Sequence, residues 1–361
     1  MSNYVEYAGA ALSTKELTGA ARAFYEAAMQ AELAKNSLSA FFPDTQVDSI
    51  DLRLEDFDFS RPEIAKNRAW DAEPFRGSTA KAGFRTFQNV PISQAEVLSE
   101  LDQLRARLSN DDKILNLVYG SLTRQVKAVI ERGEFIAADT PAGQAVIDAL
   151  EYQRGLTLTN AKFTATTRGG VKFEDDWGRA PEANPTSAIQ FNNPDADILG
   201  ELEKFSDAYK KLNGFRPGTI LVSPTIKRAI ARNKQFTVNL NNGGYIPGNT
   251  AQVNAVLENN ELPALTTYER DVNVGGVLTP VLDPKNVYLL PPSAQGILGN
   301  TVFSPTTASM EAGFSPAEQS GIYAGIHQRP TVPSTREVVV DAVAMPVLSN
   351  PNFAFVSKVL P

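Results

Sequence analysis

The stretch Thr335-Arg-Glu-Val-Val-Val-Asp-Ala-Val-Ala-Met-Pro-Val-Leu348, near the end of the chain, decides the fold. Its β-branched and apolar residues predict a long strand that belongs to a β-rich final third. We expect Pro346 to interrupt this strand, because proline donates no backbone hydrogen bond. The Asn350-Pro351-Asn352 turn is expected to follow, so that the chain ends in a pair of strands.

The N-terminal part of the sequence predicts a terminal helix followed by a two-stranded excursion. Ser13-Thr-Lys-Glu16 has the form of a capping box, and apolar residues at helical spacing, Phe24 among them, continue to about Asn36. Apolar residues alternate with charged ones on both sides of a polar stretch between about Phe42 and Val90. The terminal helix is expected to pack on its own domain or, alternatively, on a neighbouring subunit. Two strands cannot bury a face of their own, so we expect the excursion to find its partner in another subunit.

The excursion combines arginine and lysine with large aromatic residues, a composition typical of contacts between proteins. A mobile loop that carries ordinary surface charge is the alternative interpretation. The candidate subunit-contact residues are Phe24 in the terminal helix and Arg68, Trp70, Phe75, Arg76, Lys81 and Arg85 in the excursion.

A second capping box, Ser93-Gln-Ala-Glu96, predicts the start of a helix that carries Val97 and the following leucines. Apolar residues at helical spacing between Ile114 and Ile130, before Gly133, predict the longest helix of the chain, which would serve as a spine. Only a small helix is expected around Gln144–Tyr152.

The central part of the sequence predicts a separate α/β lobe. Asp195 or Asp197 is expected to cap a helix that ends at Gly214. Thr219-Ile-Leu-Val-Ser predicts a buried strand, and Ser223-Pro224 predicts the start of another helix.

Composition excludes several classes of function. The chain of 361 residues contains no cysteine, which excludes disulfides and cysteine-ligated metals, and its net charge of −7 argues against general nucleic-acid binding. The N-terminus lacks the pattern of a signal peptide, and no apolar stretch reaches the length of a membrane span. We therefore expect a cytoplasmic protein of two or three lobes.

The sequence offers little for catalysis. It contains no phosphate-binding glycine loop and no nucleophile elbow, and the single histidine, His327, lies in a stretch that resembles a turn. Glu174-Asp175-Asp176 is interpreted as a solvated turn rather than a cation site, because it lacks the spaced oxygen ligands of a calcium loop. We predict a protein that is not an enzyme, with no catalytic residue, no metal and no cofactor.

Four stretches carry a resemblance to a known family: Phe41-Phe-Pro-Asp-Thr45, Val171-Lys-Phe-Glu-Asp-Asp-Trp-Gly178, Leu289 to Thr301, and Pro346 to Val356. With the order of the elements, they resemble the phage lambda major head protein (major capsid protein E) family of tailed bacteriophages, which has the capsid fold of phage Hong Kong 97. The resemblance implies an α+β fold with an N-terminal arm, an extended β-hairpin loop, a long spine helix with a peripheral β-sheet, and a central α/β lobe.

The resemblance also implies a division of the chain into five parts. These are an N-terminal arm (1–41), the extended loop (42–91), a peripheral domain with the spine helix (92–187), an axial domain (188–329), and terminal strands that return to the peripheral domain (330–361).

The function implied is that of a virion shell subunit. Copies would form the hexamers and pentamers of an icosahedral shell around double-stranded DNA, assembled in the bacterial cytoplasm with scaffold, portal and decoration proteins, and would mature from a procapsid. Some such shells join a lysine to an asparagine, which points to Lys81 with Asn350 or Asn352, but nothing in the sequence supports this crosslink. The alternatives are an encapsulin-like nanocompartment shell and a two-lobed ligand-binding protein or hydrolase.

Overall fold

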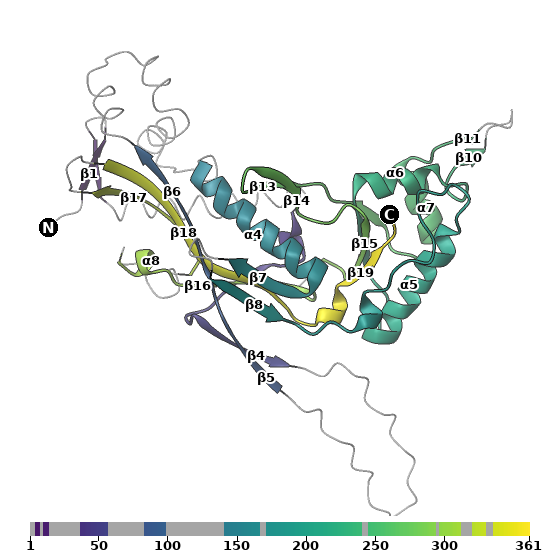
Figure 1. Cartoon of the computed structure of the whole chain (residues 1–361), viewed down its shortest axis with the longest axis horizontal. Helices are drawn as coiled ribbons and strands as arrows, with labels where there is room; N and C mark the ends of the chain where they lie inside the picture. Colours follow the sequence, from purple (N-terminus) through teal and green to yellow (C-terminus); the bar gives the residue numbers. More distant parts are fainter. Residues whose placement is uncertain are drawn as a thin grey trace, which may run out of the picture.

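A computed structural model of the chain describes residues 4–7, 10–13, 37–56, 83–98, 141–166, 171–239, 245–293, 296–311, 320–329 and 335–361. Two sheets organise these residues, a long sheet at one end of an elongated molecule and a smaller sheet inside a helical lobe at the other (Figure 1). The fold is therefore mixed α and β, as expected. The predicted helix up to Asn36 and the predicted spine helix at 114–130 lie outside the described residues.

The long sheet is built around β18 (Thr335–Leu348). Its first half lies between β17 (Ile322–Arg329) and β6 (Pro91–Leu98), and its second half pairs with β16 (Gly299–Ser304). The short β3 (Asp44–Gln46) adds a parallel strand to β16. The predicted long terminal strand is thus the axis of the sheet.

Three predictions for this region are wrong. Ser93–Glu96 lies in the strand β6 and starts no helix, because pairing with the distant valine-rich β18 outweighs the local capping signal. β18 continues through Pro346, which is tolerated because the pairing with β6 has already ended at Val343. His327 lies in the strand β17 and not in a turn.

Helix α4 (Pro141–Asn160, 20 residues) packs against the long sheet and is much longer than the small helix predicted around Gln144–Tyr152. Gly155, inside this helix, allows a close approach to Val281. A Cβ atom at this position would lie 2.3 Å from the carbonyl oxygen of Val281. The helix therefore continues through the glycine because its packing requires the small residue.

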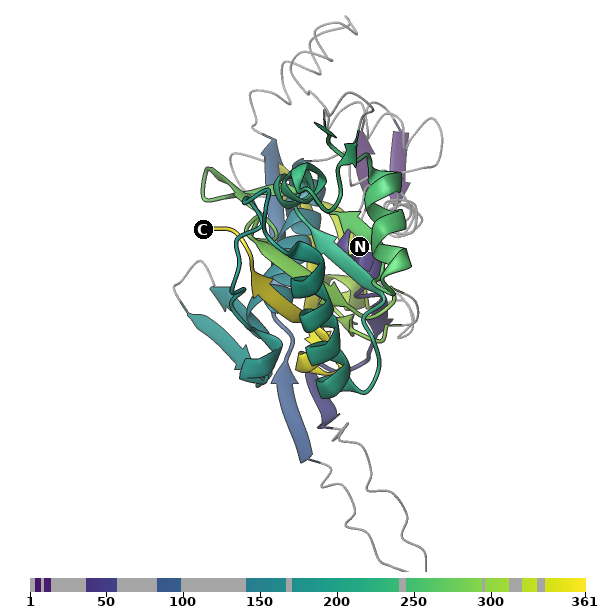
Figure 2. The ribbon, with the colours of Figure 1, turned by 90° about the vertical axis from the view of Figure 1, so that its right-hand side faces the viewer.

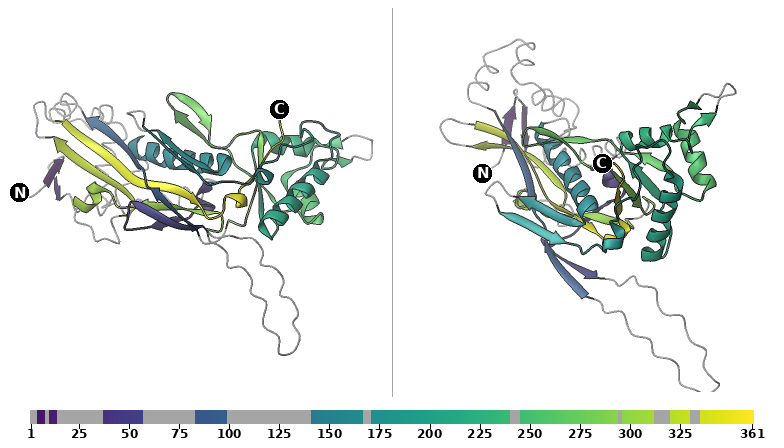
Figure 3. Two further views of the ribbon diagram at one scale, coloured as in Figure 1. Left: turned by 60° about the horizontal axis from the view of Figure 1, so that its bottom comes forward. Right: turned by 45° about the vertical axis from the view of Figure 1, so that its right-hand side comes forward.

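Two hairpins flank the body. The strands β4 (Asp51–Asp56) and β5 (Gly83–Gln88) pair antiparallel and lead away from the body (Figure 3), in agreement with the predicted two-stranded excursion. The strands β7 (Lys162–Thr166) and β8 (Lys172–Asp176) form the second hairpin, so the acidic cluster Glu174–Asp176 lies in a strand and not in the predicted turn.

The lobe contains the sheet β12-β9-β15-β19, formed by Leu265–Thr267, Thr219–Val222, Asn286–Leu290 and Phe355–Lys358. Helices α5 (Ile198–Asn213), α6 (Pro224–Arg232) and α7 (Thr250–Asn259) surround it. Asp197 caps α5 and Gly214, with φ of 86°, ends it, while Ser223 caps α6, as predicted. β18 and β19 lie in different sheets, so the expectation that they pair with each other is wrong.

The remaining elements are short. They are the strands β1 (Tyr4–Tyr7), β2 (Ala10–Ser13), β10 (Val238–Asn239), β11 (Tyr245–Ile246), β13 (Asp271–Val274) and β14 (Val277–Pro280), the helix α8 (Thr307–Glu311), and the 3-10 helices η1 (Leu38–Ala40), η3 (Pro181–Ala183) and η4 (Pro351–Phe353).

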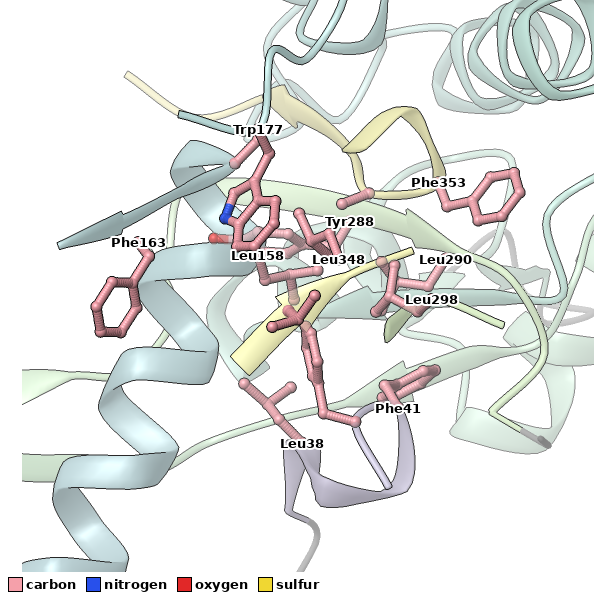
Figure 4. Packing of buried hydrophobic residues seen from close by; sticks show 14 of the residues in the cluster. Leu38, Phe41, Leu158, Phe163, Trp177, Tyr288, Leu290, Leu298, Leu348 and Phe353 are labelled. Carbon is pink, nitrogen blue, oxygen red and sulfur yellow. The ribbon is translucent and has the colours of Figure 1, made fainter. Parts of the chain in front are cut away.

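The lobe sheet separates two hydrophobic cores. Leu221, Tyr288 and Val356 face the core that α4 and the long sheet share (Figure 4), whereas Val222 and Phe355 face the core of the lobe. Neighbouring residues of one strand point to opposite faces, so a single set of strands serves both cores. Because the lobe sheet contributes residues to both cores, it joins the lobe to the rest of the described body.

Candidate functional site

The predicted subunit-contact residues fall almost entirely outside the described part of the chain. Phe24, Arg68, Trp70, Phe75, Arg76 and Lys81 lie outside it. Arg85 lies in β5 opposite Leu54, and its side chain is not described. These residues therefore stay a prediction.

The root of the excursion is fixed to the body. Leu52 and Phe87 are both buried at 6% exposure, and the ring of Phe87 lies 4.5 Å from the ring of Trp177, centroid to centroid. The Asn89 amide nitrogen donates to Val302 O at 3.2 Å and to Ser304 Oγ at 2.6 Å. These contacts fix the base of β4 and β5 on the body.

A buried ionic junction joins helix α4 to two other segments. The Glu151 carboxylate, fully buried, accepts hydrogen bonds from Ser37 Oγ (2.9 Å), the Leu38 backbone N–H (2.7 Å) and the Tyr268 hydroxyl (2.7 Å). It also pairs with Arg154 at 3.2 Å, one turn along the same helix. The junction therefore ties the segment that leads into β3 and the loop after β12 to α4.

Arg154 extends the same junction toward the long sheet. Its guanidinium donates to Thr301 Oγ1 in β16 at 2.9 Å and pairs with Asp44 in β3 at 3.2 Å. Thr301 Oγ1 in turn donates to Phe42 O at 3.2 Å. One buried cation thus holds the parallel pair of β3 and β16 against α4.

The surroundings of Glu151 keep its carboxylate ionised. Burial alone would raise the pKa of Glu151, but the charge of Arg154 and the donors at Leu38, Tyr268 and Ser37 outweigh burial and lower it. Burial and the neighbouring Glu151 charge raise the pKa of the Tyr268 phenol, so the hydroxyl remains a donor. The junction is a structural network in which every charge has a partner.

The C-terminal end of α4 is closed by a second, half-buried cation. Ala161 adopts a left-handed conformation with φ of 49°, and the Arg179 guanidinium donates to the carbonyl oxygens of Leu158 and Thr159, the latter at 2.9 Å. Burial lowers the pKa of Arg179 to about 10, which leaves it charged at neutral pH. A cation at this end also complements the helix dipole.

The hairpin of β13 and β14 exposes apolar residues at its tip. Val274, Val277 and Leu278 are 42%, 66% and 73% exposed. Gly275 and Gly276 form the two-residue turn with φ of 62° and 91°, conformations that favour glycine. The hairpin projects from the body beside α4 (Figure 1), so this apolar tip is accessible to another molecule.

The candidates for chemistry have structural roles where they are described. Asp176 pairs with Lys162 at 3.0 Å, and burial raises the pKa of Asp175. The Asn350 side chain caps η4 by accepting from Asn352 N–H, and Asn352 Oδ1 accepts from Ala180 N–H at 2.8 Å. Both asparagines considered for a crosslink are thus engaged within the subunit.

Two kinds of site are absent from the described residues. They contain no group of three histidine, cysteine, aspartate or glutamate side chains placed to hold a metal ion. Among the described helices, none combines the length and the apolar character needed to cross a bilayer.

Sequence reasoning missed the junction and the apolar hairpin. Glu151 and Arg154 are spaced as a helical pair among apolar residues, which is a usable but weak signal. Gly275-Gly276 between valines is a stronger hairpin signal that the prediction did not use. The partners of Glu151 come from distant parts of the chain and carry no local signal.

Comparison with solved structures finds a likeness in fold over nearly the whole chain. No protein-family model matches the sequence, and no curated protein matches it. A prophage protein from E. coli CFT073, assigned as a capsid protein, superposes with a TM-score of 0.59 at 14% identity over 95% of this chain and 98% of that chain.

Two further structures match less well. A phage-related protein from Bordetella bronchiseptica RB50 gives a TM-score of 0.49 at 13% identity, over 91% of this chain and 93% of that one. The mature capsid of bacteriophage PhiM1 gives 0.47 at 12% identity, over 87% and 84%. The superposition with the prophage protein from E. coli CFT073 shows that this chain has the same fold over nearly its whole length.

Proposed function

We propose that the chain is the major capsid protein of a tailed bacteriophage or prophage, a subunit that assembles into a closed icosahedral shell and catalyses no reaction. The observation that carries this proposal is the likeness to the prophage protein assigned as a capsid protein, which spans nearly the full length of both chains. A likeness over the full length argues that the whole subunit, with its excursion and both sheets, serves one purpose.

The architecture suits a shell subunit for a physical reason. The two cores share the lobe sheet, and the Glu151 junction holds α4, β3 and the loop after β12 together, so the body is rigid. The excursion leaves this body from a buried root at Phe87 and Trp177. A rigid body with a projecting element can make many modest contacts, and a closed shell gains its stability from their number.

The finer parts of the proposal follow the sequence resemblance. The chain would belong to the lambda-like major head proteins and form hexamers and pentamers around double-stranded DNA, with procapsid maturation. Scaffold, portal and decoration proteins would be its partners, the host cytoplasm its place of assembly and the virion its final location.

The five sequence ranges, from the N-terminal arm (1–41) to the terminal strands (330–361), remain a proposal. The two sheets do not follow these ranges. The strands β16 and β17 fall in the axial range (188–329) but pair with β18 of the terminal range, whereas β19, also in the terminal range, lies in the lobe sheet.

Electron microscopy of the chain co-expressed with its neighbouring genes, combined with an assay of the particle contents, tests the proposal. We expect uniform closed shells that protect double-stranded DNA from nuclease. Shells that enclose enzyme cargo instead would assign the chain to an encapsulin-like nanocompartment. A protein that forms neither rings nor shells under any condition would overturn the proposal.

A further inference from the structure

An open cationic cleft lies beside the C-terminal strand of the lobe. Residues of α6, the loop before β15 and the last residues of the chain line this cleft of ≈ 720 Å³. Three of its lining residues are the cations Arg228, Arg232 and Lys285, and the others are asparagine, threonine, alanine, leucine and proline. The charged side chains of the cleft therefore have one sign, on a chain with a net charge of −7.

The three cationic side chains of this cleft form no ion pair with a described aspartate or glutamate. Arg228 donates Nε–H to the Pro224 carbonyl oxygen of its own helix at 3.1 Å, and neither Arg232 nor Lys285 forms an ion pair with a described residue. All three residues are exposed. Like charges held near one another repel, and an anionic group that enters the cleft relieves this repulsion.

Unpaired carboxylates lie at the opposite edge of the same lobe. Glu258, in the last turn of α7, and Glu261, just after it, are exposed and form no ion pair with a described residue. In the order β12-β9-β15-β19, Glu261 leads into the edge strand β12, whereas Leu360 and Pro361 in the cleft follow the other edge strand, β19. Figure 2 shows the C-terminus and the green helix α7 on opposite sides of the lobe.

We infer that the cleft binds the Glu258–Glu261 surface of a second copy of this chain, in a head-to-tail contact between neighbouring lobes. This inference rests on the proposed function. A ring of identical subunits needs a heterologous interface, in which one face of each subunit fits a different face of the next. Complementary charges at the two edges of one lobe meet that requirement and set the direction of the ring.

Charge reversal at each face separately tests the inference. Arg228→Glu with Arg232→Glu places like charges across the contact, and Glu258→Lys with Glu261→Lys does the same from the other side. Each double variant is expected to reduce ring and shell assembly by about tenfold or more at low salt. All four positions are exposed, so thermal unfolding of each double variant is expected to match the wild type.

Two further experiments distinguish the predicted contact from a general effect of charge. The variant that carries all four substitutions exchanges the signs of both faces, so it is expected to assemble again. An equimolar mixture of the two double variants allows only contacts between unlike variants. It is therefore expected to form rings with an even number of subunits, hexamers included, and no pentamers.

The outcomes separate this inference from the function on which it rests. Wild-type shells together with normal assembly of both double variants would overturn the cleft contact and leave the shell function standing. The cleft contact is also overturned if the Arg228→Glu, Arg232→Glu variant assembles normally but binds DNA less well. That result would show that the cleft binds the phosphate groups of DNA. A wild-type chain that never assembles would overturn both.

Discussion

The Glu151 carboxylate of α4 and the Tyr268 hydroxyl of the lobe lie 2.7 Å apart, at 0% and 4% exposure. This single contact joins the helix that supports the long sheet to the loop that leaves the lobe sheet. Because Ser37, Leu38 and Arg154 bind the same carboxylate, the loss of Glu151 leaves several buried donors without an acceptor.

Glu151→Ala is expected to lower the free energy of unfolding by about 3–5 kcal/mol, because it leaves the buried Arg154 with Asp44 as its one carboxylate and removes the acceptor of three further donors. Tyr268→Phe removes one donor and is expected to cost about 1–3 kcal/mol. Urea unfolding of the unassembled subunit measures both. Glu203→Gln, an exposed change on α5, is the control and should stay within about 0.5 kcal/mol of wild type. A Glu151 variant as stable as this control would show that the junction contributes nothing.

The contribution of Glu151 should depend on pH with a definite sign. Its pKa in the folded protein is lowered, although burial alone would raise it, because Arg154 and the surrounding donors favour the charged form. The stabilisation is therefore present above the unfolded pKa of about 4.3 and is lost as pH falls through the lower folded pKa. The difference in unfolding free energy between wild type and Glu151→Gln should shrink from pH 7 toward pH 3. A difference that grows on acidification would contradict the assignment.

Gly155→Ala is expected to destabilise the subunit by about 1–3 kcal/mol, because the added Cβ would lie 2.3 Å from the Val281 carbonyl oxygen. The sign is diagnostic, since glycine to alanine inside an ordinary helix stabilises by about 0.5–1 kcal/mol. Thermal unfolding measures the change. An increase in stability would show that α4 does not approach Val281 this closely.

The sequence predicts those elements whose signals are local. Asp197, Gly214 and Ser223 mark their helix ends by themselves, and the structure confirms each of them. The strand β6 and the full length of α4 were missed because their causes are distant: β6 is held by β18, and Gly155 is explained only by Val281. The Glu151 junction was missed for the same reason, whereas the predicted contact residues of the excursion remain to be tested by experiment.

The apolar tip of the β13–β14 hairpin should matter for assembly and not for folding. Val277→Asp with Leu278→Asp changes two residues that are 66% and 73% exposed, so the unfolding free energy should shift by only about 0.5 kcal/mol. We expect fewer assembled particles by sedimentation, because a charge would be buried at a contact between molecules. Normal particle yield from this variant would show that the tip stays in solvent after assembly.

The two tryptophans of the chain should report different events. Trp177 is 3% exposed and packs on Phe87, so Trp177→Ala is expected to cost about 3–5 kcal/mol of subunit stability. Trp70→Ala with Phe75→Ala should leave that stability unchanged and impair assembly, because their partner is predicted to be another subunit. In a Trp177→Phe background, the emission of Trp70 should shift to shorter wavelength on assembly. An emission maximum that does not move would contradict a contact at Trp70.

The molar mass of the purified chain, measured by light scattering across a range of protein and salt concentrations, tests the central claim most directly. A shell subunit predicts rings of five or six copies and closed particles far above the 39.1 kDa of one chain. A mass that stays at that of one chain under every condition, with or without the neighbouring gene products, would contradict the account.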